Sequence, residues 1–295
     1  MKVLVTGTEG QIARSLVEAA SVHAGIDVVA IGRPDLDLEQ PGSAERVIAQ
    51  LAPDIVINAA AYTAVDAAED EPQRAFRVNA EAAGEVAAAA ARIGAPVVHL
   101  STDYVFDGTA DEPYEENAAV NPLSVYGKSK LAGEEQVRSA NANHLILRTA
   151  WVYSPFGRNF VKTMISAAAR GLPLTVVSDQ RGSPTSALDI AAGLLTIAER
   201  WKTEPAPGLG QTFHLAGTGS ASWFGFAQAI MDECRKHGAP AVEIQPIASA
   251  QWPTKAPRPS NSVLNSCKFA REFGYSPPPW EQSLAIVAGR LLDTP

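Results

Sequence analysis

The stretch KVLVTGTEGQIA, residues 2–13, joins a short apolar run to a glycine-rich turn at the start of the chain. The run predicts a buried strand, and the apolar residue at every fourth position from 12 to 20 predicts an amphipathic helix. Gly7 permits the tight turn, Gly10 lets the backbone approach a pyrophosphate, and Ala13 lies where helix and strand pack closely. The unpaired N–H groups of the helix N-terminus favour a phosphate there. The stretch therefore predicts a dinucleotide-binding strand–helix unit.

The first half of the chain repeats this strand–helix rhythm. Between the strands, the alanine-rich stretch Ala80–Ile93 has high helix propensity. Short, non-alternating runs rich in Val, Ile and Leu predict further strands that are covered on both faces, at Asp27–Ile31, Ile55–Asn58, Val97–Ser101 and Leu145–Thr149. The alternation predicts an α/β fold with a doubly wound parallel sheet of the Rossmann type.

After about Thr149 the rhythm becomes irregular and richer in proline and glycine. A helix from Leu188 to about Arg200 and a strand around Phe213–Leu215 are expected to return to the main sheet. We therefore expect a dinucleotide-binding domain at 1–150 with about 186–216. A smaller C-terminal α/β substrate lobe is expected at 151–185 and 217–295.

Composition excludes several classes of partner. The 295 residues carry a net charge of −8, which argues against nucleic-acid binding, and their apolar stretches are too short to span a membrane. Cys234 and Cys267 lie far apart without CxxC spacing, so two reduced thiols are expected. The protein is thus expected to be soluble and cytoplasmic. No histidine has metal-ligand spacing, and we expect no metal.

His99 and an acidic cluster are expected to have structural roles and not catalytic ones. His99 lies inside a predicted strand, where a hydrogen-bonded core histidine is the expected reading. The acidic cluster at residues 66–71 is expected to be solvated and to cap a helix.

The end of the second predicted strand bears on cofactor choice. An NAD fingerprint places an acid there, but this strand ends in Gly32-Arg33. Arg33 suits the 2′-phosphate of NADP, the alternative being a solvated loop residue. NADPH is therefore the preferred cofactor, and NADH stays possible. Asp37 and Leu38 lie where this fold often cradles adenine; alternatively they form a surface turn before Pro41.

Tyr126 and Lys130 are four residues apart, which places them on one face of a helix. They follow the end of a central predicted strand, at Thr102, by roughly 25 residues, and ligands bind at such carboxyl edges. Carbonyl reduction needs a proton donor, and a free tyrosine with a pKa of about 10 is a sluggish one. Lys130 and an oxidised nicotinamide would stabilise the phenolate. We predict Tyr126 as proton donor, Lys130 as its tuner and ribose ligand, and Thr102 as the group that orients the carbonyl; alternatively Tyr126 is a half-buried aromatic residue.

Together these motifs resemble the dTDP-4-dehydrorhamnose reductase family of the extended short-chain dehydrogenase/reductase superfamily. The resemblance extends over nearly the whole chain. The matching stretches are Gly7–Ala13, Asn58–Asp66, Asn79, STDYVFDG at 101–108, YGKSKLAGE at 126–134, RTAWVY at 148–153, Asp179-Gln180, Gly182–Thr185, Arg258-Pro259 and Asn261-Ser262. Ala13 stands where the family usually has glycine.

The resemblance implies NADPH-dependent reduction of the C4 ketone of dTDP-4-dehydro-β-L-rhamnose, a small-molecule substrate. The rivals are another sugar-nucleotide reductase or epimerase of the superfamily, and a non-catalytic NADP-binding regulatory subunit. The family often forms homodimers. Implied cofactor contacts are Gly10, Gln11, Ile12, Ala61, Tyr62, Thr63 and Asn79. Implied substrate contacts are Thr102, Asp103, Tyr126 and Trp151, although Trp151 is otherwise plain core; Arg258 contacts the diphosphate or caps the lobe.

Overall fold

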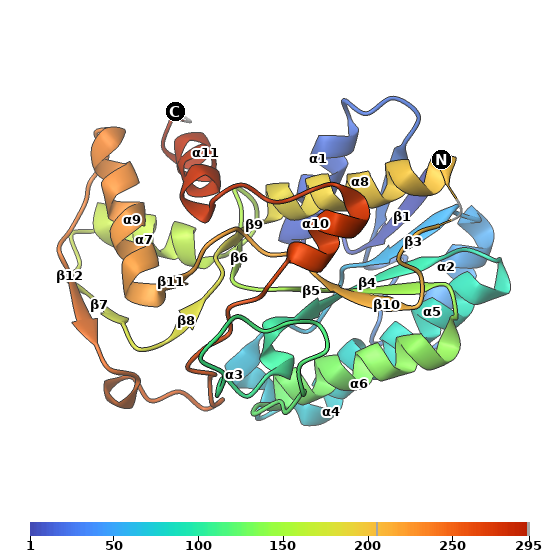
Figure 1. The fold of residues 1–295 in the computed structure, drawn as a ribbon, viewed down its shortest axis with the longest axis horizontal. Helices are drawn as coiled ribbons and strands as arrows, with labels where there is room; N and C mark the ends of the chain where they lie inside the picture. The colour runs from blue at the N-terminus through green and yellow to red at the C-terminus, as the bar shows by residue number, and fades with distance from the viewer. Residues whose placement is uncertain (205, 294–295) are drawn as a thin grey trace.

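The computed structural model describes residues 1–204 and 206–293, and its centre is a parallel six-stranded sheet (Figure 1). The strand order is β10-β5-β4-β3-β1-β2. The strands are β1 (Lys2–Thr6), β2 (Asp27–Ile31), β3 (Ile55–Asn58), β4 (Val97–Thr102), β5 (His144–Thr149) and β10 (Gln211–His214). The first three strands have the predicted bounds, and β4 and β5 each differ by one residue. The strand predicted around Phe213–Leu215 begins two residues earlier and ends one residue earlier.

Helices cover both faces of this sheet (Figure 1), which confirms the doubly wound α/β prediction. On one face α1 (Gln11–Ala20) packs against α8 (Ala187–Thr203), and α10 (Cys267–Phe273) lies beside them. On the other face lie α2 (Ser43–Leu51), α5 (Ala82–Arg92) and α6 (Val125–Ala140). Each face has its own apolar core, because strands covered on both sides bury alternate side chains in opposite directions.

The segment between β3 and β4 is more broken than predicted. Two short helices, α3 (Val65–Ala68) and α4 (Pro72–Phe76), precede a π-helical turn, η1 (Arg77–Glu81), before α5 begins. The helical stretch therefore starts well before Ala80, at a proline in the first turn, where its missing N–H costs nothing. π-Turns of this kind are frequent at functional sites.

The remaining elements gather beside this unit, at the left of Figure 1. They include α7 (Phe160–Ala169), α9 (Trp223–Lys236), α11 (Trp280–Leu292), the single-turn helix η3 (Ser249–Gln251) and three two-stranded pairs. A second single-turn helix, η2 (Asp103–Val105), directly follows β4 and packs against α6. The pairs are β6 (Val152–Tyr153) with β9 (Thr185–Ser186), β7 (Leu174–Val177) with β12 (Ile244–Ile247), and β8 (Arg181–Gly182) with β11 (Ala221–Ser222). An aromatic core that includes Tyr153, Phe226 and Trp280 holds them together. The proposed domain boundaries stay a prediction, and residues 294–295 of the predicted lobe lie outside the described residues.

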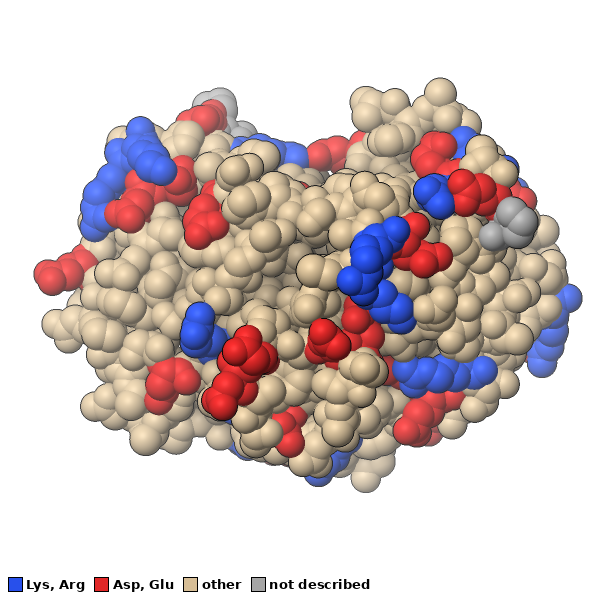
Figure 2. Space-filling view, viewed as in Figure 1, with Lys and Arg blue, Asp and Glu red and all other residues tan. Residues whose placement is uncertain are grey.

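Acidic and basic side chains are interspersed on the face shown in Figure 2, with wide neutral areas between them. Within residues 1–204 and 206–293, no helix is both long and apolar enough to cross a bilayer.

Candidate active site

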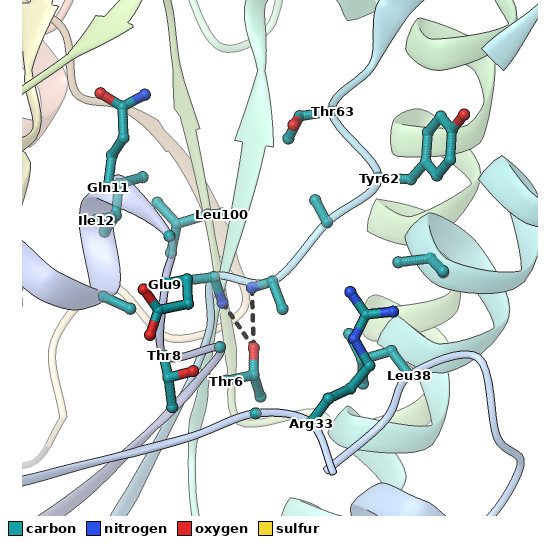
Figure 3. Close-up of a pocket in the computed structure, with 18 of the residues that line it drawn as sticks. Thr6, Thr8, Glu9, Gln11, Ile12, Arg33, Leu38, Tyr62, Thr63 and Leu100 are labelled. Carbon is teal, nitrogen blue, oxygen red and sulfur yellow. Dashed lines mark hydrogen bonds between the residues drawn. The ribbon is translucent and has the colours of Figure 1, made fainter. Parts of the chain in front are cut away.

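A cavity of about 540 Å³ opens at the carboxyl ends of β1, β3 and β4 (Figure 3). It brings together most of the residues that the sequence predicted to bind a cofactor. Those that line it are Gly7, Gly10, Gln11, Ile12, Arg33, Asp37, Leu38, Ala61, Tyr62, Thr63, Tyr126 and Lys130. The cavity therefore lies at the strand edge where this fold binds ligands.

The glycine-rich turn forms one wall of the cavity. Gly7 has a φ of +92°, a conformation that glycine adopts without strain, and its N–H donates to Ile31 O at 2.6 Å. Gly10 is the N-cap of α1 and supplies no side-chain cap, so the first N–H groups of α1 are left for a ligand. A Cβ at Gly10 would meet no atom within 4 Å, which shows open space above the turn. This wall fits a pyrophosphate.

The segment after β6 lies over the turn and is held by Gln11. The side-chain amide of Gln11 donates to Val152 O at 3.2 Å, and its Oε1 accepts from Ser154 Oγ at 2.9 Å and from Asn159 Nδ2 at 3.1 Å. Arg158, in this segment, also lines the cavity. The sequence prediction missed Arg158, because no local pattern relates it to a turn almost 150 residues earlier.

Two guanidinium groups lie at the other end of the cavity. Arg33 is 69% exposed and 3.7 Å from Glu39 Oε1. Arg74, which the sequence prediction missed, lies 2.8 Å from the same oxygen and over the ring of Tyr62. Leu38 is 7% exposed and supplies an apolar surface beside them. This end suits an adenine with a ribose phosphate.

Asn79 does not line the cavity. It is buried in η1, where its Oδ1 accepts from Tyr62 N at 2.8 Å and its Nδ2 donates to Tyr62 O at 3.0 Å and Ser129 Oγ at 3.0 Å. Asn79 therefore fixes the backbone of the lining residue Tyr62 against α6.

Tyr126 stands in the first turn of α6, whose N-cap Ser124 accepts from Gly127 N at 3.1 Å. Gly127 allows close approach, since a Cβ there would lie 2.2 Å from Tyr104 O. The ring of Tyr126 meets that of Tyr104 edge-on at 5.6 Å. Burial raises the pKa of Tyr126 to about 12, while a hydrogen bond with Thr102 acts in the opposite direction.

Lys130 follows one turn later and is 3% exposed. Its Nζ donates to Leu100 O at 2.7 Å. Burial lowers the pKa of Lys130 to about 8, and the charge of Glu134 opposes this shift. Glu134 is itself bound by Arg148, at 2.8 Å from both carboxylate oxygens, and by Arg138. Tyr126, Lys130 and Glu134 thus form one stripe along α6, as the four-residue spacing predicts.

Thr102 ends β4 and Asp103 begins η2, and neither residue lines the cavity. Thr102 Oγ1 donates to Asp103 Oδ1 at 3.0 Å and accepts from Tyr104 N at 3.2 Å. Asp103 is 2% exposed, and burial raises its pKa to about 6 against hydrogen bonds from Ser262 and Thr102. Thr102 and Asp103 are both buried, and the contact of either with a sugar stays a prediction.

Trp151 has a left-handed backbone, with a φ of +45°, which is rare for a bulky residue. Its ring stacks on Trp223 at 3.5 Å, with an interplanar angle of 7°. Gly182 leaves the necessary space, because a Cβ there would lie 2.3 Å from the Trp151 ring. Strain of this kind at a partly exposed aromatic residue is typical of ligand sites.

The acidic cluster is largely exposed, as predicted, with Asp66 45% and Asp70 59% exposed. Within the described ranges, no carboxylate caps α3 or α4, but Glu69 binds the first N–H of α6. Asp66 binds Arg258 at 2.7 and 3.2 Å, and Asp70 pairs with Lys255. Glu69 accepts from Val125 N at 2.8 Å. These carboxylates hold the start of α6 and residues 255–258 to the region of α3, because complementary charges from distant segments meet there. Arg258 therefore pairs with Asp66. The described part of the chain contains no group of three or more His, Cys, Asp or Glu side chains that could hold a metal.

Known proteins share both sequence and fold with this chain. The model of the RmlD substrate binding domain family matches residues 1–292. A dTDP-4-dehydrorhamnose reductase from Sinorhizobium fredii is 46% identical over 292 residues, covering 99% of this chain and 98% of the relative. The chain belongs to the dTDP-4-dehydrorhamnose reductase family.

Solved structures agree with this assignment to the reductase family. A dTDP-4-dehydrorhamnose reductase from Clostridium acetobutylicum has 36% identity and a TM-score of 0.89, with 100% of both chains covered. One from Bacillus anthracis, solved in complex with NADP, has 34% identity and a TM-score of 0.88, covering 97% of this chain and 98% of that one.

Proposed function

We propose that this chain is an NADPH-dependent reductase that converts the C4 ketone of dTDP-4-dehydro-β-L-rhamnose to the alcohol of dTDP-β-L-rhamnose. The observation that carries the proposal is that Tyr126 and Lys130 share one cavity with the glycine-rich turn. Membership of the reductase family supports the substrate, and the NADP in the Bacillus anthracis relative supports the cofactor.

The cavity residues fit NADP(H). The uncapped start of α1 suits the pyrophosphate, and Arg33 with Arg74 suits the 2′-phosphate. Thr149 lines the cavity, and its buried Oγ1 has no hydrogen-bond partner among the described residues. When bound, the cofactor supplies the hydride.

The side chains at the start of α6 deliver the proton that the reduced ketone needs. Reduction places negative charge on the ketone oxygen, and Tyr126 delivers a proton there. A Tyr126 pKa of about 12 keeps that proton bound at neutral pH until the charge develops. Lys130, with a pKa of about 8, is mainly charged at neutral pH and stabilises the phenolate. We propose that Thr102 orients the carbonyl, for which its hydroxyl proton must turn from Asp103 Oδ1 to the substrate oxygen.

The test is to follow NADPH absorbance after adding dTDP-4-dehydro-L-rhamnose and to identify the product by mass and NMR spectra. We expect one NADPH oxidised for each sugar nucleotide reduced. Interconversion of sugars without net NADPH oxidation would instead indicate an epimerase. Cofactor binding without turnover of any sugar nucleotide would indicate a regulatory subunit.

We also propose a cytoplasmic location and a homodimeric assembly. Both cysteines are unpaired, Cys234 buried and Cys267 exposed, which suits a reducing compartment. The homodimer rests on the family alone, and sedimentation velocity measures it directly.

A further inference from the structure

Four buried polar side chains lie in a row along one side of the cavity; the two at the ends line it, and the two between them do not. Thr6, Asn58 and His99 come from β1, β3 and β4, which are neighbours in the sheet, and Lys130 comes from α6. Asn58 and His99 are register partners, and Val5 pairs with Ile57 one residue before Thr6 and Asn58. All four are at most 3% exposed. The row joins the glycine-rich turn to the predicted proton machinery.

The backbone fixes the direction of the hydrogen bonds in this row. Thr6 Oγ1 accepts from the N–H groups of Ala59 and Ala60, both at 3.0 Å (Figure 3). These two bonds occupy both acceptor positions of the hydroxyl, so its own proton must be donated. It goes to Asn58 Oδ1 at 2.9 Å. The amide of Asn58 is thereby oriented with its NH₂ group toward His99.

This orientation selects one tautomer of His99. Asn58 Nδ2 donates to His99 Nδ1 at 3.0 Å, so Nδ1 carries no proton. Burial, together with the charges of Lys130 and Arg138, holds the pKa of His99 well below its ordinary value, and the ring is neutral. A neutral imidazole with a free Nδ1 carries its proton on Nε2. That Nε2 lies 3.5 Å from Lys130 Nζ.

A donor at this position discriminates between the two forms of Lys130. An ammonium group has no lone pair and cannot accept from Nε2–H, whereas an uncharged amine can. Leu100 O accepts from Nζ at 2.7 Å and can do so in either form.

Most of the other polar groups around Lys130 have hydrogen-bond partners, although Asp103 Oδ2 has none among the described residues. On α6 itself, Glu134 is bound by Arg138 and by Arg148 of β5. From η2, Asp103 is bonded to Thr102, and Tyr104 packs on Tyr126. Two further contacts are Glu69 with Val125 N, and Asn79 with Ser129. At Nζ itself, the side chain whose hydrogen-bonding state can distinguish the two forms of Lys130 is His99.

We propose that Thr6, Asn58 and His99 are positioning residues that hold His99 as its Nε2–H tautomer and thereby favour release of a proton from Lys130. The release step rests on the proposed function. After Tyr126 gives its proton to the substrate oxygen, an N–H bond of Lys130 breaks and the O–H bond of Tyr126 re-forms. The lone pair left on Nζ accepts from His99 Nε2–H. Lys130 then regains its proton from solvent, and no electrons are exchanged.

The first experiment reads the tautomer directly, by long-range ¹H–¹⁵N correlation on ¹⁵N-histidine-labelled protein without cofactor. His144 and His214 are matched internal controls, because their Nδ1 atoms face the carbonyls of Asn141 and Tyr114 at 2.8 and 3.1 Å and must carry the proton. We expect His99 alone of these three to be the Nε2–H tautomer, and His99→Gln to assign its signals. An Nδ1–H ring or an imidazolium at His99 between pH 6 and 8 would overturn the proposal.

The second experiment changes the tautomer of His99 with two variants. Asn58→Asp should favour the Nδ1–H form, and Asn58→Leu removes the selecting amide without adding a charge. A carboxylate at position 58 cannot donate to Nδ1 and instead accepts from it, so the ring proton moves from Nε2 to Nδ1 and Nε2 becomes an acceptor for the Lys130 ammonium. Titration of ¹³Cε-labelled lysine should show the Lys130 pKa higher than wild type in both variants, by about one pH unit in the aspartate variant. A Lys130 titration unchanged in Asn58→Leu would overturn the coupling.

Kinetics separate this inference from the proposed function. Reduction needs protonated Lys130, so the rate falls as pH rises through its pKa, and a raised pKa moves this falling limb to higher pH. We expect the limb of Asn58→Asp to move with the NMR titration and the plateau kcat to decrease, because Lys130 is a weaker acid. If wild type reduces no sugar nucleotide, the proposed function fails while both NMR outcomes still decide the tautomer and its coupling to Lys130.

Discussion

The glycine-rich turn and the surroundings of Trp151 are both predicted to contact a ligand, but they are built by different means. In the turn, one strand, one helix and the backbone freedom of Gly7 suffice, and all of these lie within residues 2–20. The ring of Trp151 depends instead on the Trp223 stack and on the space left at Gly182, both distant in sequence. A surface of the first kind can be read from a motif, whereas one of the second kind exists only once the chain has folded.

The largest effect is expected where the two surfaces must act together, in the proton transfer. Tyr126→Phe should lower kcat by roughly 10²- to 10⁴-fold, the usual contribution of a positioned acid. Calorimetric titration should show unchanged NADPH affinity, since the ring remains. Tyr275→Phe is the matched control, because that hydroxyl donates to Asp189 O away from the cavity. Near-normal kcat in Tyr126→Phe would place the proton donor elsewhere.

A pair of glycine substitutions should separate the two surfaces. Gly182→Ala puts a Cβ against the Trp151 ring and should cost about 1–3 kcal/mol of unfolding free energy, as overpacking does. Its KM for the sugar nucleotide should rise while the Kd for NADPH holds. Gly10→Ala meets no atom at a φ of −68°, so its stability should hold while its NADPH Kd rises.

Urea unfolding and calorimetric titration of both variants test this crossed pattern. If Gly182→Ala weakens NADPH binding as much as it raises the sugar-nucleotide KM, the two surfaces are not separable.

The distinction between local motifs and features that depend on tertiary packing also explains how much of the structure the sequence predicted. Strands β1, β2 and β3 have their predicted bounds because continuous apolar runs flanked by glycine or polar residues are local signals. The strand β10 was displaced because its first residues, Gln211 and Thr212, are not apolar. It pairs with β5 through backbone hydrogen bonds at the edge of the sheet.

Within the site, residues of the local motifs line the cavity, but Arg74 and Arg158 were missed. Each reaches the cavity through tertiary packing, over Tyr62 and over the glycine-rich turn respectively. The reading of His99 as a hydrogen-bonded core residue was made without its partners. The structure identifies Asn58 and Lys130 as the neighbours of its two ring nitrogens, and these contacts are the basis for a testable role of His99.

The exposure of the acidic cluster was predicted, but its pairing with Arg258 and Lys255 was not, because those cations come from a distant segment of the chain. A double-mutant cycle with Asp66→Asn and Arg258→Ala should give a coupling of about 1 kcal/mol at pH 7, since the pair is partly exposed. Asp232→Asn, in an exposed pair with Arg235, is the control and should change stability little.

The pH dependence of this coupling has a definite sign. The hydrogen bond from Arg258 is the largest cause that lowers the pKa of folded Asp66. The coupling should therefore be complete above the unfolded pKa of about 3.9 and be lost as pH falls through the lower folded value. Urea unfolding of the four proteins across this range measures it, and a coupling that grows on acidification would contradict the assignment.

The smallest effect is expected at Arg33, where the motif-based reading depends on a side chain that is 69% exposed. A screened contact with the 2′-phosphate should contribute roughly 0.5 kcal/mol, so Arg33→Ala should lower the NADPH-to-NADH affinity ratio about two- to threefold. Arg74 faces the same end of the cavity and shares Glu39, so Arg33→Ala with Arg74→Ala should lower the ratio further. Titrating NADPH and NADH into Arg33→Ala, Arg74→Ala and the double variant shows which of the two guanidinium groups binds the 2′-phosphate. The NADPH-to-NADH affinity ratio could stay unchanged in Arg33→Ala and fall in Arg74→Ala. Arg74, which reaches the cavity only through tertiary packing, would then recognise the 2′-phosphate in place of Arg33. The cofactor site would in that case depend on distant parts of the chain, as the surroundings of Trp151 do.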